Sequence, residues 1–275
     1  MKYCYYNGRI LPENKARISL NDIGFLRCYA VFEIFRTYNR KPFLFKEHLA
    51  RFRNSAEALH LKFPFVEKKL LADITRLLKK NGLADGVVKI ILTGGESEDG
   101  LNCNYNRPNA YILVKKLPKY SPAIYQQGVK INTFEHQREL PSVKTNNYLT
   151  MVKLQKLRLE QAAAETLYVW KSLALEGATS NFFIFKGDIL ITAKNSILSG
   201  ITRNFVIKLA KKRFRVQERD VKFNEIKQAD EAFITSATRE IWPVVKIDKN
   251  KIGDGRVGKN TKILMDLFKE YTDKY

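Results

Sequence analysis

Two short stretches decide how this chain is interpreted: VKTNNYL at residues 143–149 and LEGATSNF at residues 175–182. The first places Lys144 just after Pro141 and ahead of a short polar patch, not on a charged helix face. The second places Glu176 between the apolar strings LAL and FFIF. Such surroundings indicate a partly buried carboxylate, which has to be paired to stay ionised. Taken by themselves, these residues also fit a surface lysine and a strand-end surface glutamate, 32 residues apart, so the pattern alone leaves both interpretations open.

A third stretch, SGITR at residues 199–203, opens an amphipathic helix predicted over 201–214. The backbone N–H groups at a helix start form an anion site, and a glycine there allows close approach. Ser199 as a simple helix cap explains the same pattern, and both can hold. An amine, an acid for a ring nitrogen and a phosphate site are the protein parts that pyridoxal 5'-phosphate requires.

Composition describes an ordinary globular protein. The 275 residues, 45% hydrophobic and 28% charged, are enough for one large or two ordinary domains. No apolar run approaches the roughly 20 residues of a membrane helix, and the first residues lack a secretory h-region. Three cysteines without CxxC spacing indicate reduced thiols and a cytoplasmic location. Three histidines without metal-ligand spacing predict no metal site.

The net charge of +21 is the one unusual number. It is compatible with nucleic-acid binding, but the basic residues are spread through the chain and no RNA- or DNA-binding motif accompanies them. A basic surface that attracts anionic metabolites explains the charge as well.

Alternating patterns predict two domains: an N-terminal α/β domain over 1–118, a proline-containing linker over 119–122, and a cofactor-binding domain over 123–275. Helices are predicted over 46–61, 66–80, 201–214 and 260–271. Strands are predicted over 30–38, 87–93, 110–115, 129–134, 166–170, 182–185, 189–192, 231–235 and 241–247.

Together these motifs resemble the class IV aminotransferase family, also called fold type IV of the pyridoxal-phosphate enzymes. The family includes branched-chain and D-amino-acid aminotransferases and aminodeoxychorismate lyase. The resemblance runs from YNG at residues 6–8 to the last helix, and EGATSNF is its most specific string. It implies a mixed α/β (α+β) fold with a smaller N-terminal α/β domain and a larger, strand-rich C-terminal pseudo-barrel. It also implies a homodimer.

The resemblance assigns the cofactor residues one by one. Lys144 would form the Schiff base with pyridoxal 5'-phosphate and then move the proton in transamination. Tyr148 would hydrogen-bond the ring hydroxyl, and Glu176 would pair with the pyridinium nitrogen. Asn181 would tie its loop together. The residues that would contact the phosphate are Arg51, Ile201, Thr202, Ser236 and Ala237.

Substrate residues are expected in the first domain. Arg27 lies among apolar residues and is the first candidate for the substrate carboxylate, in its own or a neighbouring subunit, with Phe32 nearby in the same signature. Lys89 interrupts an apolar strand and is the second candidate for binding the substrate carboxylate, because a buried cation is stable only beside an anion. Family members commonly have glycines where this chain has Cys28 and Ala30, and a positive φ at Ala30 would be strained.

The function expected from these residues is amino transfer between an amino acid and a 2-keto acid. A D-amino acid is favoured as donor and a branched-chain L-amino acid is the second choice. A lyase of the same fold that releases pyruvate from aminodeoxychorismate is the alternative. A basic nucleic-acid-binding protein is a distant third interpretation.

Overall fold

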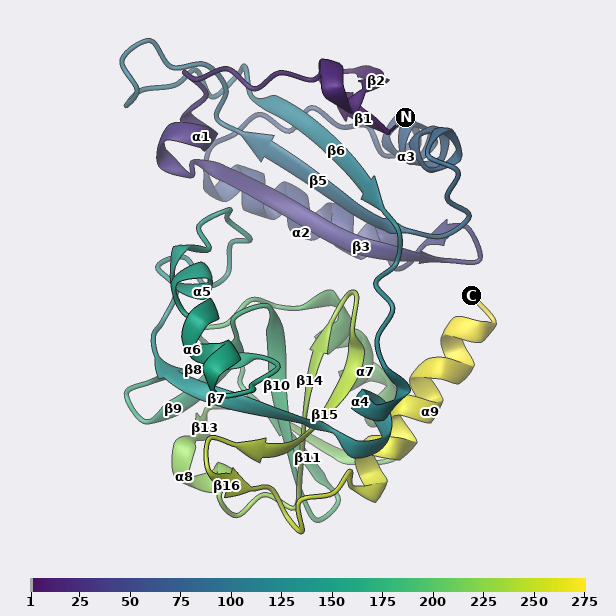
Figure 1. The fold of residues 1–275 in the computed structure, drawn as a ribbon, viewed down its shortest axis with the longest axis vertical. Coiled ribbons are helices and arrows are strands. Elements are labelled where there is room, and N and C mark those ends of the chain that lie inside the picture. The colour runs from purple at the N-terminus through teal and green to yellow at the C-terminus, as the bar shows by residue number, and fades with distance from the viewer. Residues whose placement is uncertain (1) are drawn as a thin grey trace. The chain divides into compact units, whose positions relative to one another are not determined.

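The computed structural model describes residues 2–275, which divide into two compact units (Figure 1). Unit 1 holds the residues up to Pro118 together with Val143–Tyr148 and Tyr275, and unit 2 holds Lys119–Ser142 and Leu149–Lys274. This differs from a division at a single linker. The segment that carries Lys144 belongs to unit 1 because it pairs with a strand there, through a bridge between Val31 and Thr145.

Unit 1 is built on a sheet in which six strands of the described chain pair in the order β2-β1-β6-β5-β3-β4. All its strand pairs are antiparallel. The central strands are rich in β-branched and aromatic residues, as their position requires. The strands are β1 (Tyr3–Tyr6), β2 (Arg9–Pro12), β3 (Ala30–Tyr38), β4 (Lys41–Pro42), β5 (Val87–Thr93) and β6 (Asn109–Lys115).

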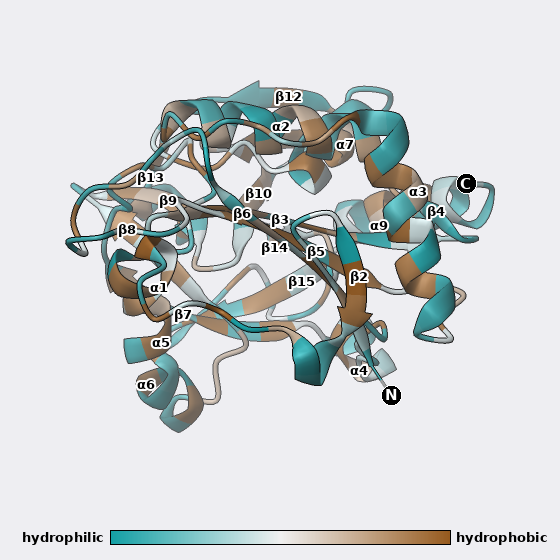
Figure 2. Cartoon of the chain, turned by 90° about the horizontal axis from the view of Figure 1, so that it is seen from above, coloured by the Kyte–Doolittle hydropathy of each residue, from teal (hydrophilic) through white to brown (hydrophobic). Residues whose placement is uncertain are grey.

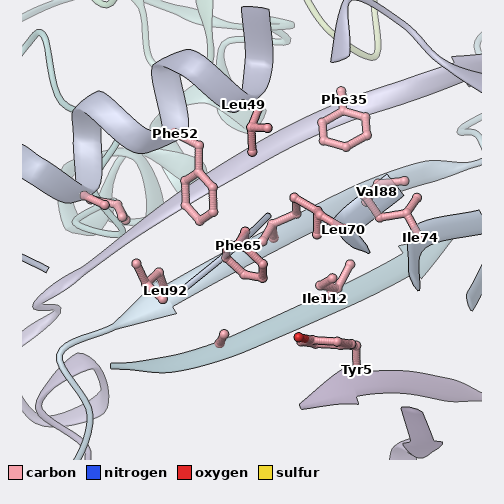
Figure 3. Close-up of a cluster of buried hydrophobic side chains, with 14 of the residues drawn as sticks. Tyr5, Phe35, Leu49, Phe52, Phe65, Leu70, Ile74, Val88, Leu92 and Ile112 are labelled. Carbon is pink, nitrogen blue, oxygen red and sulfur yellow. The ribbon is translucent and has the colours of Figure 1, made fainter. Parts of the chain in front are cut away.

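Two helices, α2 (Phe45–Ala58) and α3 (Glu67–Lys80), bury their apolar stripes against one face of this sheet. Figure 3 shows Leu49 and Phe52 of α2 directed toward Phe35 and Leu92 of the strands. Alternate residues of β3 therefore face the helices, while the residues between them face the other way. A short helix, α1 (Ile23–Arg27), and a 3-10 turn, η1 (Glu13–Lys15), complete the unit.

Unit 2 contains a larger, strand-rich sheet that closes on itself. Its six inner strands follow the order β10-β14-β15-β7-β8-β9, and β9 pairs again with β10. The β15–β7 and β7–β8 pairs are parallel and the others in this ring are antiparallel. The strands are β7 (Val129–Glu135), β8 (Thr166–Trp170), β9 (Leu173–Gly177), β10 (Ser180–Lys186), β14 (Glu231–Ser236) and β15 (Glu240–Ile247).

Strand β10 is buried on both faces, which explains its unbroken FFIF run. Phe182 and Ile184 pack inside the ring, while Phe183 stacks on Phe233 with centroids 4.7 Å apart. On the outside, Phe205 of α7 (Ile201–Ala210) packs against Phe268 of α9 (Lys259–Asp273). Coloured by hydropathy, these helices show alternating apolar and polar bands, as amphipathic helices do (Figure 2).

The remaining elements of unit 2 are short. They are α4 (Pro122–Gln127), α5 (Leu149–Lys153), α6 (Gln155–Glu160), β11 (Ile189–Thr192), β12 (Arg215–Glu218), β13 (Val221–Lys222), α8 (Phe223–Ile226) and β16 (Asn250–Lys251). Helix α7 ends at Ala210, four residues earlier than the hydrophobic pattern predicts, and a turn follows it. Across residues 2–275, no helix has both the length and the apolar character that crossing a membrane demands.

The mixed α/β class and the strand-rich, barrel-like second sheet expected from the sequence are confirmed.

Candidate active site

Lys144 is fixed in unit 1 by its backbone. Its carbonyl accepts a hydrogen bond from the Phe32 N–H at 2.9 Å, and its own N–H donates to Ser55 Oγ of α2 at 3.2 Å. Asn146 continues the pairing by donating to the carbonyl of Ala30 at 2.9 Å. The segment thus extends the sheet along the first half of β3, so the position of Lys144 does not depend on its side chain.

The Lys144 side chain lies beside an aromatic ring that a second lysine shares. Its ammonium is 4.6 Å from the Phe32 ring centroid, and the ammonium of Lys89 is 4.7 Å from the same centroid. Tyr148 packs edge-on against Phe32 with centroids 5.6 Å apart. Burial lowers the pKa of Lys89, and the nearby Lys115 lowers it further. Lys144, Phe32, Lys89 and Tyr148 therefore gather in one place in unit 1.

Glu33, the next residue along β3, faces α2 and is buried. Its Oε1 accepts from Arg51 Nη2 at 2.6 Å and from His48 Nδ1 at 3.0 Å, and its Oε2 accepts from Arg51 Nε at 3.0 Å. Burial alone would raise the pKa of Glu33, but the Arg51 charge and the His48 hydrogen bond hold it well below its usual range. Burial also lowers the pKa of His48, so its neutral ring donates through Nδ1. Arg51, the expected phosphate residue, thus uses two of its nitrogens for Glu33.

Arg27, the first candidate for the substrate carboxylate, is exposed at the end of α1, and its Nη1 donates to the Leu26 carbonyl at 3.0 Å. The residue after it, Cys28, ends the helix in the left-handed region with φ of 55°. The positive φ therefore falls on Cys28, while Ala30 begins β3 in extended conformation and is not strained. The exposed guanidinium weakens the argument for Arg27, which supposed a partly dry environment.

Glu176 lies in unit 2, near the end of β9, and is buried against an arginine. Its Oε1 accepts from Arg138 Nε at 2.9 Å and from Nη2 at 2.7 Å. Its Oε2 accepts from the Leu198 N–H at 3.0 Å, in the loop before α7. Arg138 also donates to the Pro141 carbonyl. The carboxylate charge is thus compensated by Arg138 and its orientation is fixed from two sides, as an acid that holds a ring nitrogen requires.

The start of α7 is formed by a close approach of backbone to a side chain. A Cβ on Gly200 would lie 1.9 Å from Asn181 Oδ1, so only glycine fits. Asn181 Nδ2 donates to the Leu198 carbonyl at 2.8 Å, as expected for a residue that ties the loop. Ser199 does not cap the helix; Gly200 is the N-cap, without a side-chain hydrogen bond. The backbone at Ile201 and Thr202 keeps the helix-start geometry suited to an anion.

The second expected phosphate contact, Ser236 and Ala237, lies at the turn between β14 and β15. Thr235, just before it, pairs in register with Asn181 of β10, which brings the turn to the side of the α7 start. The Thr235 hydroxyl is buried without a partner among residues 2–275. Polar atoms from the two loops therefore gather around Asn181 within unit 2.

Site residues expected from the sequence thus fall into two groups, one in each unit. Unit 1 brings together Lys144, Phe32, Lys89 and Tyr148, with Arg51 on the helix side of the same strand and Arg27 apart from them. Unit 2 brings together Glu176, the α7 start and the 236–237 turn. Sequence reasoning missed Arg138, Glu33 and His48. A signal for Glu33 existed, since an acid inside the apolar AVFEIF run demands a buried cation.

Comparison with known proteins shows the family and the fold of the chain. Residues 30–247 match the amino-transferase class IV family. A putative branched-chain-amino-acid aminotransferase of Methanocaldococcus jannaschii is 33% identical over 98% of this chain and 96% of its own length. A D-alanine aminotransferase of Staphylococcus epidermidis is 31% identical over 100% of this chain and 99% of its own.

Solved structures share the fold. A branched-chain amino acid aminotransferase from T.th., complexed with N-(5'-phosphopyridoxyl)-L-glutamate, superposes with a TM-score of 0.90 at 26% identity, over 98% of this chain and 94% of the other. The Escherichia coli branched-chain enzyme gives a TM-score of 0.91 at 24% identity, again over 98% and 94%.

The fold and these relatives define a transaminase. The chain belongs to the class IV aminotransferase family, as the sequence motifs predict.

Proposed function

We propose that this enzyme uses pyridoxal 5'-phosphate, attached to Lys144, to move an amino group from an amino acid to a 2-keto acid. The observation that carries the proposal is the setting of Lys144, whose backbone is locked to β3 and whose ammonium lies 4.6 Å from the Phe32 ring centroid. A locked backbone beneath a long, rotatable side chain suits a lysine that binds a carbonyl and then carries a proton.

Each unit, taken by itself, offers groups that suit part of the cofactor. In unit 2, the glycine-bounded start of α7, the buried Thr235 hydroxyl and the Ser236–Ala237 turn offer donors of the kind a phosphate takes. Glu176, oriented by Arg138, offers a carboxylate for a protonated ring nitrogen. In unit 1, Tyr148 beside Phe32 offers a hydroxyl for the ring oxygen. When bound, the cofactor supplies an electron sink for the carbanion formed at the amino acid.

The chain's own residues then divide the remaining work. Lys144 Nζ would accept the proton from the α-carbon of the amino acid as a general base and then donate it, as a general acid, to the carbon that takes over the amino group. Glu176 holds the ring proton in place by charge. Arg51 is retained as a candidate phosphate ligand that also anchors Glu33.

For the substrate carboxylate we place Lys89 ahead of Arg27. Lys89 is half-buried in β5, and no ion pair to it forms within residues 2–275. A half-buried cation is stabilised by an incoming anion. The ammonium groups of Lys89 and Lys144 lie 4.7 and 4.6 Å from the same Phe32 ring centroid, so both lysines border one aromatic ring.

Among donors, we favour D-amino acids, with branched-chain L-amino acids second. Relatives of both names match nearly the whole chain. The aminodeoxychorismate lyase alternative is not favoured, because these relatives are named as aminotransferases.

The test is direct. Borohydride reduction of the protein with its cofactor, followed by peptide mapping, should place the adduct on Lys144. A panel of D- and L-amino donors with several keto acids then ranks the substrates. An adduct on another lysine would refute the attachment site, and turnover without a keto acid would favour the lyase.

We also propose a homodimer in which unit 1 supplies part of the contact. Ile18, Leu20, Phe25 and Leu101 are each at least 62% exposed. Their segments are held together by the Asp22–Glu96 bridge, so the four side chains belong to one region of the unit. Apolar side chains grouped on a surface mark a contact site. Light scattering at working concentration should give twice the chain mass, and a fully active monomer would contradict this.

The free cysteines fit the reducing cytoplasm, where we place the enzyme.

A further inference from the structure

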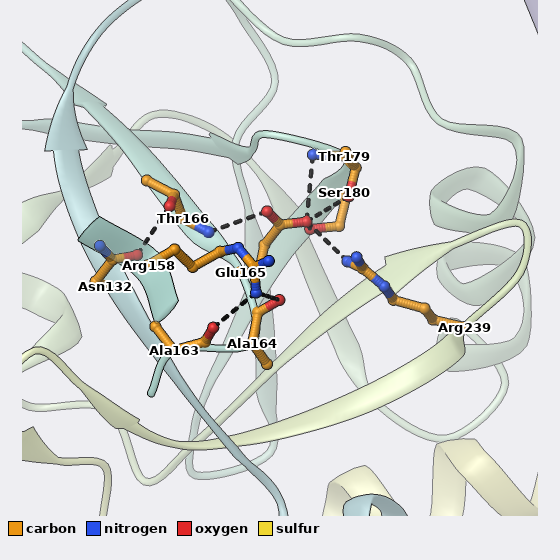
Figure 4. Close-up of polar contacts among 9 residues, drawn as sticks. All are labelled: Asn132, Arg158, Ala163, Ala164, Glu165, Thr166, Thr179, Ser180 and Arg239. Carbon is orange, nitrogen blue, oxygen red and sulfur yellow. Dashed lines mark hydrogen bonds and ion pairs between the residues drawn. The ribbon is translucent and has the colours of Figure 1, made fainter. Parts of the chain in front are cut away.

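A second buried carboxylate in unit 2, Glu165, lies outside the group formed by Glu176, the α7 start and the 236–237 turn. It precedes β8, and its side chain is only 4% exposed. Its Oε1 accepts from the Thr166 N–H at 3.0 Å. Its Oε2 accepts from Arg239 Nη1 at 2.7 Å, from the Thr179 N–H at 3.3 Å and from the Ser180 hydroxyl at 3.4 Å. Figure 4 shows Thr179, Ser180 and Arg239 converging on one Glu165 oxygen from separate parts of the chain, while Thr166 binds the other oxygen.

The donors come from two turns that carry proposed cofactor residues. Thr179 lies in the turn from β9 to β10 and Ser180 is the first residue of β10, three and four residues after Glu176. Arg239 belongs to the turn from β14 to β15, directly after Ser236 and Ala237. One carboxylate therefore fixes the turn beside the ring-nitrogen acid and the turn proposed to hold phosphate.

Arg239 is itself held from the other side. Its guanidinium stacks on the Trp242 ring at 4.8 Å, and Trp242 packs edge-on against Tyr120. The residue after Arg239, Glu240, has a φ of 62°, a left-handed conformation that is costly for a non-glycine residue. Such strain persists only when the surrounding contacts define the backbone fully, so the turn needs an anchor at Arg239.

The neighbouring residues make room for Glu165 and brace it. A Cβ on Gly177 would lie 2.2 Å from Ser180 Oγ and 3.0 Å from Glu165 Cγ, so only glycine allows this approach. Arg158 donates to the Ala163 carbonyl at 2.9 Å and holds the chain that leads into Glu165. The carboxylate is thus part of a built arrangement and not a surface pair.

We propose that Glu165 and Arg239 form a positioning pair that holds the Ser236–Ala237 turn in the geometry needed to bind the cofactor phosphate. This rests on the function proposed above. Neither residue touches the cofactor; Arg239 acts through the turn it belongs to, and Glu165 acts through Arg239 and through Thr179. Because backbone donors bind phosphate only when they point at it, a loosened turn loses phosphate affinity and little else.

The test compares two ligands that differ only in the phosphate: pyridoxal 5'-phosphate and pyridoxal. Dissociation constants of both are measured by absorbance for wild type, Arg239→Met and Glu165→Gln. The readout is the dissociation constant of pyridoxal divided by that of pyridoxal 5'-phosphate. This ratio measures how much the phosphate contributes to binding. We expect either substitution to reduce this ratio about ten- to a hundredfold. A general loss of stability weakens both ligands alike and leaves the ratio unchanged.

Three further variants complete the design. Arg219→Met removes a comparable arginine that pairs with Glu225 on the surface of unit 2, and it should keep the wild-type ratio. Arg239→Lys keeps the charge and should recover part of the ratio. The double variant Glu165→Gln/Arg239→Met leaves no unpaired buried charge, so it serves if the single variants fold poorly. Its ratio should equal that of the worse single variant, since the two residues act as one unit.

The outcomes separate this proposal from the one it rests on. If wild type binds pyridoxal 5'-phosphate no more tightly than pyridoxal, the proposed function fails at its phosphate site. If wild type shows the preference and Arg239→Met retains it in full, the positioning pair is refuted while the proposed function stands.

Discussion

Glu33–Arg51 in unit 1 and Glu176–Arg138 in unit 2 are both buried arginine–glutamate pairs, but they differ in what surrounds them. In unit 1, Glu33 and Arg51 have side chains 1% and 12% exposed, and His48 and the Ile34 N–H bind the same carboxylate. In unit 2, Glu176 and Arg138 are 7% and 18% exposed, and the acid also accepts a hydrogen bond from a loop N–H. The first acid points from the middle of a strand into a helix, and the second lies at the end of a strand among loops.

From this difference we infer that the carboxylate of Glu33 serves the packing of unit 1, whereas the carboxylate of Glu176 is placed where it can meet a ligand. Glu33 lies in the middle of a strand and is enclosed by its own unit, so a ligand cannot reach its carboxylate. Glu176 lies at the end of a strand beside a loop, which is where ligands commonly bind. We therefore expect substitutions at Glu33 to act on stability and substitutions at Glu176 to act on turnover.

The reference for chemistry is Lys144→Ala, which should have the largest effect. Loss of the proton-transferring amine alone should lower kcat by about 10²- to 10⁴-fold. The fold should survive, because the backbone of residue 144 makes the sheet contacts. Steady-state kinetics and thermal unfolding measure the two effects, with exposed Lys153→Ala as control. Unfolding of the Lys144→Ala protein would mean that the side chain is structural.

Glu33→Gln tests the structural half of the comparison. It leaves Arg51 buried without its counter-charge, and breaking a buried pair in this way costs about 3–5 kcal/mol. Urea unfolding should show a loss of this size. Glu225→Gln, in the half-exposed pair with Arg219, should cost about 1 kcal/mol or less. A Glu33 variant as stable as the control would show that the two acids do not differ in role.

Glu176→Gln tests the chemical half. An amide cannot hold the ring proton by charge, and losing one charge-assisted contact costs about 1.5–3 kcal/mol, or roughly one to two decades in rate. Absorbance should show that the cofactor is still bound while kcat falls. Wild-type turnover would mean that Glu176, like Glu33, is structural.

Lys89→Ala sharpens the comparison by removing a half-buried cation that no acid within residues 2–275 pairs with. We expect kcat/KM for amino acids to fall by about one to two decades, while a primary amine without a carboxylate is spared. Arg27→Ala is the matched control in the same unit and should have a smaller effect. If Arg27→Ala lowers kcat/KM for amino acids more than Lys89→Ala does, Arg27 binds the substrate carboxylate, for example from a neighbouring subunit.

The smallest effect that we predict is a loss of folding stability as the pH is lowered. The pKa values of His48 and Glu33 are both lowered on folding, so the unfolded chain binds protons first and stability falls as pH falls. The His48 contribution should decline below its unfolded pKa of about 6.5, and the Glu33 contribution below about 4.5. Urea midpoints measured from pH 8 to pH 4 should show this order. His48→Gln should remove the upper step and keep the lower one.

Much of the fold could be predicted from the sequence, because its strands are long, apolar runs. The predicted strands over 30–38, 87–93 and 189–192 agree with the structure to the residue. Helices α5 and α6 were not predicted, since they are short and carry exposed residues such as Leu149 and Leu159 in place of a buried stripe.

The site could be predicted only in part, for a different reason. Lys144 and Glu176 lie in local strings, whereas Arg138 meets Glu176 across 38 residues of chain, and no local pattern encodes such a contact. The sequence named Cys28 and Ala30 as positions of family glycines without deciding which of them takes a positive φ; the structure gives it to Cys28, where a helix of five residues ends.

The pairing of Val143–Tyr148 with β3 has a consequence for how the protein is made. Unit 1 is incomplete when residue 118 leaves the ribosome, because β4 covers only the end of the β3 edge opposite β5 and the first half of that edge still lacks its partner. Synthesis at about 5–20 residues per second supplies that partner roughly 1–5 s later. During this interval the nascent chain presents an open strand edge, which is a site of aggregation. The lysine segment is therefore also the piece that closes the first unit during translation.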